Sequence, residues 1–506
     1  MRERSKIASR TKNTVLNISS GLLLTGVTAI SGLVLPRLMI PTYGSEVNGL
    51  ISTITQFLSY ISLLEAGIGG VIRSALYGPL AKNDSKCVSG IINATQAFYR
   101  KVGSVFVCYI IILCIAFPLS IAKNFSPLFV IALVVILSIG TLLQYFVSLP
   151  YVAVINADQL SRICSFVDII TICVNIVLTY ALIRNGSGVL TVRFLSCLVY
   201  AARPLCYYLY VKTHYSLDKT VERNNEAIKQ RWNGFAHHIA FFIHHNTDIV
   251  VISTFIGLKA VSVYSVYYAV ASGVEKVVTA ISTGVAPSLG NVLATGSKEK
   301  INEIFNVIEF VQSIVTTVLF TTASLLVTPF MRLYTRDMND ANYIDPLFAQ
   351  LMLLAEAIYC IRLIYSTTSF SANKYKETQA GAIMECAINI VLSLIMVSRY
   401  GIIGVACGTV VAMCVRCLFD VFYLSKHVLG RSISLFCKTI TVNAAISIIS
   451  IIACKKIISY EIASAFSWCI CGVESICVIG IIAGIFAILC YKKECMVLLS
   501  KFSHKK

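Results

Sequence analysis

Apolar stretches of 18 or more residues recur along the whole chain, and they decide its class. A helix rising about 1.5 Å per residue crosses a bilayer core of about 30 Å within such a stretch. Of the 506 residues, 57% are hydrophobic and only 13% charged, whereas a soluble domain carries about 25% charged residues. No stretch shows the alternation typical of a membrane barrel. The sequence therefore predicts an all-α polytopic membrane protein.

We predict about 14 transmembrane helices, in two halves of six spans each, followed by two C-terminal spans. The predicted spans are 15–40, 49–72, 102–121, 127–148, 163–183, 189–211, 234–258, 260–285, 304–330, 347–369, 380–398, 402–424, 436–454 and 466–490. The first span follows a basic segment, as a signal peptide does. It is too long for a signal peptide and no small-residue cleavage site follows it, so we expect it to be retained.

A polar, charge-rich connection at residues 212–233 divides the chain. We predict an N-terminal lobe at 1–211, a cytoplasmic inter-lobe linker at 212–233, a C-terminal lobe at 234–425, and helices 13 and 14 with a cytoplasmic tail at 426–506. Tight turns at Gly44 and Gly257 follow the first span of each lobe, which suggests a faint internal repeat.

The net charge of +18 follows the predicted topology. With the N-terminus inside, most Lys and Arg of the loops lie on the cytoplasmic side, which predicts that both termini are cytoplasmic. This explanation of the basic charge needs no nucleic acid as a partner. The 19 cysteines lie mostly inside apolar spans, where cysteine behaves as a small hydrophobic residue.

The stretch GFAHHIAFFIHHNTDIVVISTFIGL, residues 234–258, carries four histidines and Asp248 inside a span. Helical spacing places His237, His244 and Asp248 on one face. A carboxylate at this depth costs at least about 2.5 kcal/mol, so Asp248 should face protein or a wet cavity rather than lipid. It is a candidate for coupling to a proton or a sodium ion, or for a fixed counter-ion to Lys276 or an arginine. A purely stabilising ion pair is the third alternative.

Several further charges lie inside or at the edge of the spans. Arg416 and Asp420 are four residues apart and should pair on one helix face. Arg203 and Arg362 have no obvious partner nearby in the sequence. They are candidates for binding an anionic ligand, since guanidinium binds phosphate bidentately; alternatively, they pair with Glu65 or Glu356 across helices.

No P-loop, GxSxG or HExxH motif occurs in the sequence, so we assign no catalytic residue and predict no enzymatic activity. The histidines could suggest a metal, but Asp248 is their only acidic neighbour and no second ligand cluster exists. We therefore predict no metal site and no cofactor beyond a coupling H⁺ or Na⁺. A proton-responsive histidine is the better interpretation of this stretch.

Several stretches, in order and spacing, resemble the polysaccharide transporter family within the multidrug/oligosaccharidyl-lipid/polysaccharide exporter superfamily, which comprises bacterial O-antigen and capsule repeat-unit flippases. They are Gly44-Ser-Glu-Val-Asn-Gly49-Leu50, Glu65-Ala-Gly67-Ile-Gly69, Tyr77-Gly-Pro79-Leu80-Ala81, Asn246-Thr247-Asp248, Pro329-Phe330 to Leu333-Tyr334, Asp340-Ala-Asn342-Tyr343, Lys376-Glu377-Thr378-Gln379 and Gly401-Ile-Ile-Gly404-Val-Ala-Cys-Gly408-Thr409. The chain departs from the family at Tyr264-Ser265-Val266-Tyr267, where members often have Tyr-Ser-Asn-Tyr, and in its four histidines.

The resemblance implies two six-helix lobes around a central cavity, with the two C-terminal helices outside them. It also implies a flippase that moves a lipid-linked oligosaccharide, of the undecaprenyl-pyrophosphate type, from the inner to the outer leaflet by alternating access. It implies a bacterial inner-membrane location, with membrane lipid, a polysaccharide polymerase and chain-length machinery as partners. The candidate substrate-binding cations are Arg37, Arg203, Lys276, Arg362 and Arg416. The candidate coupling or counter-ion residues are Glu65, His244, Asp248 and Glu356.

Three other functions compete with the flippase. A cation-coupled multidrug exporter would share the fold, but intramembrane cations would repel a cationic drug. A membrane polymerase or ligase needs a sizeable external loop, and no predicted external connection is long enough. A structural scaffold is disfavoured by the number of intramembrane charges, each of which must be paired or hydrated.

Overall fold

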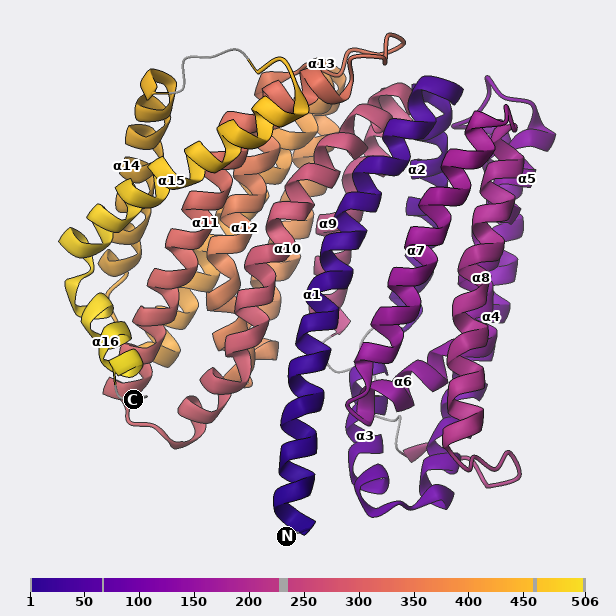
Figure 1. The fold of residues 1–506 in the computed structure, drawn as a ribbon, viewed down its shortest axis with the longest axis horizontal. Helices are drawn as coiled ribbons and strands as arrows, with labels where there is room; N and C mark the ends of the chain where they lie inside the picture. The colour runs from indigo at the N-terminus through magenta and orange to yellow at the C-terminus, as the bar shows by residue number, and fades with distance from the viewer. Residues whose placement is uncertain (1, 66–67, 227–234, 458–461, 504–506) are drawn as a thin grey trace. The chain divides into compact units, whose positions relative to one another are not determined.

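The computed structural model describes residues 2–65, 68–226, 235–457 and 462–503, and these are helical almost throughout (Figure 1). Within these ranges, 11 helices are long and apolar enough to cross a membrane. One of them, Tyr375–Leu429, has 55 residues and contains two of the predicted spans. The prediction of an all-α polytopic membrane protein is confirmed.

The chain forms two compact units. The first comprises Met1–Phe242 and Gly257–Ser262, and the second comprises Ile243–Ile256 and Val263–Lys506. The change from one unit to the other therefore falls inside a helix rather than in the polar connection at 212–233. The predicted lobe boundaries were drawn from composition, and they stay predictions.

Helices α1 to α8 and two short irregular helices, among the described residues, build most of the first unit. They are α1 (Arg2–Tyr43), α2 (Ser45–Ser59), the 3₁₀ helix η1 (Tyr60–Glu65), α3 (Ile68–Lys82), α4 (Ser85–Leu119), α5 (Pro127–Leu143), the π-helix η2 (Gln144–Ser148), α6 (Leu149–Ala157), α7 (Ser161–Arg184) and α8 (Val189–His214). Helix α1 packs along α7, and α8 packs against α5 and α7.

The second unit begins within α9 (Phe235–Phe255) and takes in most of α10 (Leu258–Thr295). It continues through α11 (Lys298–Tyr334), α12 (Pro346–Ser371), α13 (Tyr375–Leu424), the π-helix η4 (Ser425–Leu429), α14 (Ser434–Ile457), α15 (Ala465–Cys490) and α16 (Lys492–Ser503). Helices α14 and α15 pack against each other and against α11 (Figure 1).

Short polar side chains fix where several helices begin. Asp84 accepts a hydrogen bond from the backbone N–H of Cys87 at the start of α4, 2.9 Å away. Asp345 accepts one from Phe348 at 3.0 Å, and Pro346 opens the same helix, α12. Such caps satisfy N–H groups that have no partner within the helix, and proline has none to lose at the first position.

Both tight turns predicted at glycine are present. Gly44 joins α1 to α2 with φ 88°, and Gly257 joins α9 to α10 with φ 123°. These are backbone angles that glycine alone adopts without strain. Gly49 of α2 is needed for a different reason, because a Cβ there would lie 1.8 Å from the carbonyl oxygen of Leu258.

Helix α13 covers two predicted spans, 380–398 and 402–424, and breaks between them. Gly401 has φ 57° and ψ −135°, which reverses the chain within one residue. The two arms then pack closely: a Cβ at Gly404 would lie 2.4 Å from the Met396 carbonyl oxygen, and one at Gly408 would lie 2.8 Å from Ser393 Oγ. Glycine at these two positions therefore allows the two helical arms to approach closely.

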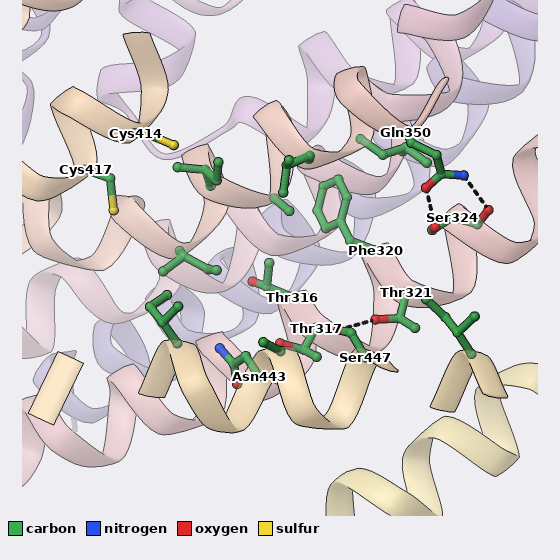
Figure 2. Close-up of a pocket in the computed structure, with 18 of the residues that line it drawn as sticks. Thr316, Thr317, Phe320, Thr321, Ser324, Gln350, Cys414, Cys417, Asn443 and Ser447 are labelled. Atoms are coloured by element: carbon green, nitrogen blue, oxygen red, sulfur yellow. Dashed lines mark hydrogen bonds between the residues drawn. The ribbon is translucent and has the colours of Figure 1, made fainter. Parts of the chain in front are cut away.

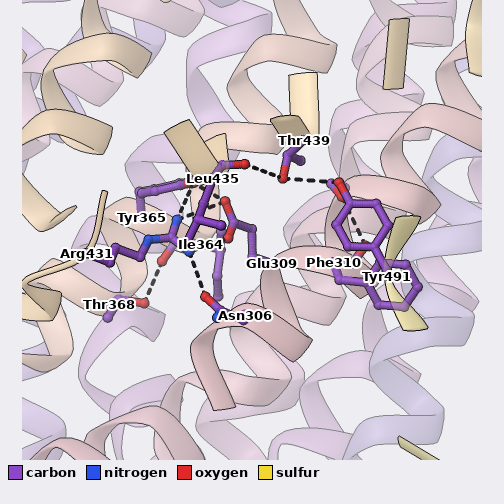
Figure 3. A network of polar contacts seen from close by, with 11 residues as sticks. Asn306, Glu309, Phe310, Ile364, Tyr365, Thr368, Arg431, Leu435, Thr439 and Tyr491 are labelled. Carbon is purple, nitrogen blue, oxygen red and sulfur yellow. Dashed lines mark hydrogen bonds and ion pairs between the residues drawn. The ribbon is translucent and has the colours of Figure 1, made fainter. Parts of the chain in front are cut away.

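A buried arginine holds the start of α14 to the rest of the second unit (Figure 3). Arg431 donates to both carboxylate oxygens of Glu309 on α11, at 2.7 and 3.0 Å. It also donates to Asn306 at 2.7 Å and to the hydroxyl of Tyr365 at 2.8 Å. The Tyr365 hydroxyl itself donates to Glu309. The bidentate contact is the strong, directional form of an arginine–carboxylate pair.

Candidate functional site

Asp248 lies in the part of α9 that belongs to the second unit, and only 4% of its surface is exposed. Its carboxylate accepts hydrogen bonds from the Tyr264 hydroxyl at 3.0 Å and from Thr409 Oγ1 at 3.1 Å. The expectation that Asp248 faces protein rather than lipid is confirmed. Among the described side chains no cation pairs with it, so only neutral donors balance its charge.

Thr409 connects Asp248 to the second unit's longest helix. Its hydroxyl lies within hydrogen-bonding distance of both Asp248 and the Val405 carbonyl oxygen, 3.1 Å away, and it accepts from Asn389 Nδ2 at 3.0 Å. A hydroxyl has one hydrogen to donate, so it serves Asp248 or Val405 at any moment. Two neighbouring oxygens, Asn389 Oδ1 and Ser393 Oγ, are buried and have no partner.

A small cavity of about 20 Å³ opens beside the Asp248 carboxylate. Its walls include Tyr264, Tyr268, Glu356 and Thr409. A space of this size holds one water-sized occupant. An occupant there would have carboxylate, hydroxyl and phenol oxygens on one side, the ligand type that hard cations prefer, and apolar side chains such as Met352 on the other.

Two further carboxylates share the electrostatic field of this cavity. Glu356 on α12 is 5% exposed, its Oε2 has no hydrogen-bond partner, and it interacts with the charges of Glu275 and Asp248. Glu275 on α10 is 8% exposed and accepts a hydrogen bond from Thr279 at 3.1 Å. Glu275 also interacts with the charge of the adjacent Lys276, whereas no cation among the described residues faces Asp248 or Glu356. Buried acids of this kind favour uptake of a proton or a cation.

The arginines of α12 and α13 form a compensated cluster instead. Arg362 Nη1 lies 3.2 Å from Asp420 Oδ2, and Arg416 Nε lies 3.1 Å from the same oxygen. Arg416 Nε is also 3.8 Å from Glu385. The predicted pairing of Arg416 with Asp420 is confirmed. Arg362 has no partner nearby in the sequence, as expected, but it has one on the next helix, 58 residues along the chain.

Arg203 belongs to the first unit and is also paired. Its Nε lies 3.2 Å from Asp168 and donates to Thr171 at 2.6 Å, and the guanidinium lies over the Tyr200 ring at 4.5 Å. The partner is on α7, one helix before Arg203. The predicted pairings of Arg203 and Arg362 with Glu65 or Glu356 are therefore wrong: Glu65 accepts from the Tyr145 hydroxyl at 2.9 Å.

The remaining candidates are spread over the chain. Lys276 is exposed and follows Glu275 on α10, and Arg37 is partly exposed on α1. The described hydrogen bonds to Asp248 come from Tyr264 and Thr409. No described contact joins Lys276 to Asp248, so the counter-ion role of Lys276 stays a prediction. The side chains of His237 and His244 lie outside the described residues, and with them the predicted face shared with Asp248.

Sequence reasoning missed most of the surroundings of Asp248. Thr409 and Asn389 lie 161 and 141 positions away in the sequence, and no local pattern connects them to Asp248. The signal that pointed to both Asp248 and Thr409 was the family resemblance, because Asn246-Thr247-Asp248 and Gly408-Thr409 are among the stretches that carry it. Arg193 on α8 was also overlooked; its Nε is buried and has no hydrogen-bond partner.

No protein-family model matches the chain, and no curated protein matches it. Solved structures do match. The lipid II flippase MurJ in an inward closed conformation is similar over 95% of this chain and 99% of its own, with a TM-score of 0.70 and 16% identity. The MATE multidrug transporter DinF-BH matches over 83% of this chain and 95% of its own (TM-score 0.61, 15% identity). The eukaryotic MATE transporter AtDTX14 matches over 82% and 96% (TM-score 0.58, 14% identity). At these identities the likeness establishes the fold, which is that of membrane transporters.

Proposed function

We propose that the protein is a flippase that moves a lipid-linked oligosaccharide across the membrane by alternating access. The observation that carries the proposal is the extent of the likeness to the lipid II flippase, which leaves 5% of this chain unmatched. Helices α14 and α15 have 24 and 26 residues, so the match must include a large part of this pair. The two MATE transporters leave about a sixth of the chain unmatched.

For the anionic headgroup of such a substrate we propose Arg203 as a contact. Its side chain is 20% exposed and a single carboxylate faces it, so a phosphate can share or replace that partner. Arg362 and Arg416 are 9% and 3% exposed and already share Asp420 and Glu385, which favours a structural role for both. Arg193, with its unpartnered Nε, is the better second candidate. Arg37 and Lys276 remain predicted contacts.

For the driving force we propose a proton or a sodium ion that binds beside Asp248 and travels as coupled cargo. The support is the buried, unpaired carboxylate with a cavity next to it. The hydroxyls of Tyr264 and Thr409 that now donate to the carboxylate can turn to present oxygen lone pairs to an ion. The bacterial inner membrane and the polymerase and chain-length partners belong to this proposal as well.

The test is a flipping assay in proteoliposomes that contain a lipid-linked oligosaccharide with a labelled sugar. A membrane-impermeant reagent modifies only the outward-facing label, so flipping raises the modified fraction with time. We expect Arg203→Ala to abolish flipping at normal protein level, and Arg203→Lys to keep part of it, since lysine supplies the charge without the bidentate geometry. Arg362→Ala should instead lower the amount of folded protein, because it removes one partner of a buried ion pair.

Normal flipping by Arg203→Ala would exclude Arg203 as a contact. Failure of the unmodified protein to flip any lipid-linked oligosaccharide would exclude the flippase itself.

A cation-coupled exporter of small molecules is the second candidate function. The observation that favours it is the acidic surroundings of Asp248, Glu275 and Glu356, which would attract a cationic substrate. Efflux of a cationic dye from the same proteoliposomes, in the absence of oligosaccharide flipping, would select this function.

A further inference from the structure

A deep groove lies within the second unit, between α11, α12, the second arm of α13, and α14 (Figure 2). Its volume is about 550 Å³, within the range of about 300–1,000 Å³ typical of small-molecule sites. Asp248 and the small cavity beside it do not contribute to its walls. The groove is therefore a second site, which the proposed transport function does not explain.

The groove runs along the helices and opens toward hydrocarbon. Its lining on α14 extends from Phe436 to Ile451, about 22 Å at 1.5 Å per residue. Leu354 and Leu418 also line it and are 49% and 60% exposed. On helices long and apolar enough to cross a membrane, such exposed leucines face lipid chains. An elongated apolar occupant lying parallel to the helices fits this shape.

The lining contains no charged residue among the described side chains. A charged group placed in the groove would be unpaired in a medium of low dielectric constant, at a cost of several kcal/mol. Most of the polar lining groups are already bonded: Thr317 donates to the Ser313 carbonyl oxygen at 2.8 Å, and Thr321 and Ser447 bond to each other at 2.9 Å. The groove thus selects a neutral, mainly hydrocarbon molecule.

Asn443 on α14 is the exception among the polar lining residues. It is 6% exposed, and neither its amide nitrogen nor its amide oxygen has a hydrogen-bond partner. It lies nine residues after Ser434, about 14 Å into a helix long and apolar enough to cross a membrane. A buried amide with no protein partner is satisfied by a polar atom of an occupant of the groove. Figure 2 shows its side chain directed from α14 toward Thr317 and the groove.

We propose that this groove binds a neutral membrane lipid whose hydrocarbon lies along the helices and whose hydroxyl or ester carbonyl bonds to Asn443. A diacylglycerol has this chemistry: it has no charged headgroup, so its glycerol can lie deeper than that of a phospholipid. An ordinary phospholipid keeps its phosphate at the interface and offers only its chains to the groove. The neutral lipid satisfies both the shape of the groove and the amide of Asn443.

Photolabelling tests the proposal. The protein is reconstituted into vesicles that contain trace diacylglycerol with a diazirine in one acyl chain, or phosphatidylglycerol with the same chains. After irradiation, labelled peptides are identified by mass spectrometry. We expect diacylglycerol to label the groove segments of α11 and α14 more strongly than phosphatidylglycerol does. Equal labelling by the two lipids would mean ordinary contact with acyl chains and would overturn the proposal.

Three variants sharpen the test. Asn443→Leu should reduce groove labelling by diacylglycerol about two- to tenfold, the value of one net hydrogen bond, and leave labelling by phosphatidylglycerol unchanged. Ala444→Phe should abolish groove labelling by both lipids, because Ala444 is an exposed lining residue and the larger side chain fills the groove. Thr441→Leu is the matched control: Thr441 is exposed on the same helix, and its hydroxyl donates to the Cys437 carbonyl oxygen.

The variants also separate misfolding from loss of the site. Asn443→Leu removes an unsatisfied buried amide, so its thermal stability in detergent should equal or exceed that of the unmodified protein. Undiminished diacylglycerol labelling in Asn443→Leu would refute the role of Asn443. Undiminished labelling in Ala444→Phe would refute the groove as the place of binding.

Discussion

At the scale of single residues, Asp248 is held by neutral hydroxyls, and this allows a clean substitution. Asp248→Asn keeps the shape of the side chain and an oxygen for Tyr264 and Thr409, so stability should change by only about 1 kcal/mol. If Asp248 carries the coupling ion, flipping should no longer respond to an imposed proton or sodium gradient. The measurement is the initial rate in proteoliposomes with and without each gradient.

Ser253→Ala provides the control, because Ser253 is buried on the same helix and its hydroxyl donates to the Val250 carbonyl oxygen. It should retain gradient dependence. A fixed counter-ion role for Asp248 predicts a different result, namely loss of folded protein in Asp248→Asn, because a buried cation would be left unpaired. Normal abundance together with normal gradient dependence would exclude both roles.

The ion pairs show which residue contacts a sequence can predict. Arg416 and Asp420 lie one helical turn apart, and helical geometry alone brings them together. Arg203 and Asp168 lie on successive helices, as do Arg362 and Asp420, and their meeting depends on how those helices are rotated about their axes. Helical spacing gives the face on which a residue lies but not the neighbour that the face meets. For the same reason Asp248 was predicted as buried while Tyr264 and Thr409 were missed.

At the scale of elements, Arg431 determines how α14 joins the second unit. Arg431→Met leaves the Glu309 carboxylate buried without its bidentate partner, which should destabilise the protein by about 3–5 kcal/mol. Thermal unfolding in detergent measures the change. The double variant Arg431→Met with Glu309→Leu should recover most of it, because replacing both members of a buried pair with apolar residues is often neutral. Equal destabilisation by the single and double variants would contradict this account.

Hydropathy predicted where the helices lie but not how their backbones are wound. The turns at Gly44 and Gly257 were predictable, since glycine between two apolar runs marks a helix end. The predicted span at 49–72 begins as α2, becomes the 3₁₀ helix η1 at Tyr60, and resumes as α3 at Ile68. The π-helices η2 and η4 were not expected either. A change in the hydrogen-bonding period leaves the apolar content of a segment unchanged, so composition carries no sign of it.

At the scale of the whole molecule, the predicted topology places both termini in the cytoplasm. The reason is the excess of Lys and Arg in the connections assigned to that side. Reporter fusions after Lys506 and within residues 212–233 should both report a cytoplasmic location. A fusion after Asp340, in the connection between α11 and α12, should report the opposite side. An external signal from either of the first two fusions would contradict the topology.

The overall class and the order of the helices were predictable because a membrane imposes length and hydropathy on every span. Which residues come together to form a binding site was harder to predict from the sequence. The groove beside Asn443 is made of residues that each look like ordinary lipid-facing or packing positions, and only their assembly from four helices creates the site. Hydropathy also carries no information on the identity of the substrate.

The turn after α9 has a consequence for how chains of this kind can recombine. Residues 257–262 follow 14 residues of the second unit, yet they belong to the first. Leu258 is part of the first unit's hydrophobic core, its carbonyl lies against Gly49, and Ser262 accepts a hydrogen bond from Asn48 at 2.8 Å. A chimera that exchanges residues 1–233 with those of a relative would separate this six-residue segment from the surface it evolved to fit. A chimera that also exchanges 257–262 would inherit the two together, and it should yield more folded protein.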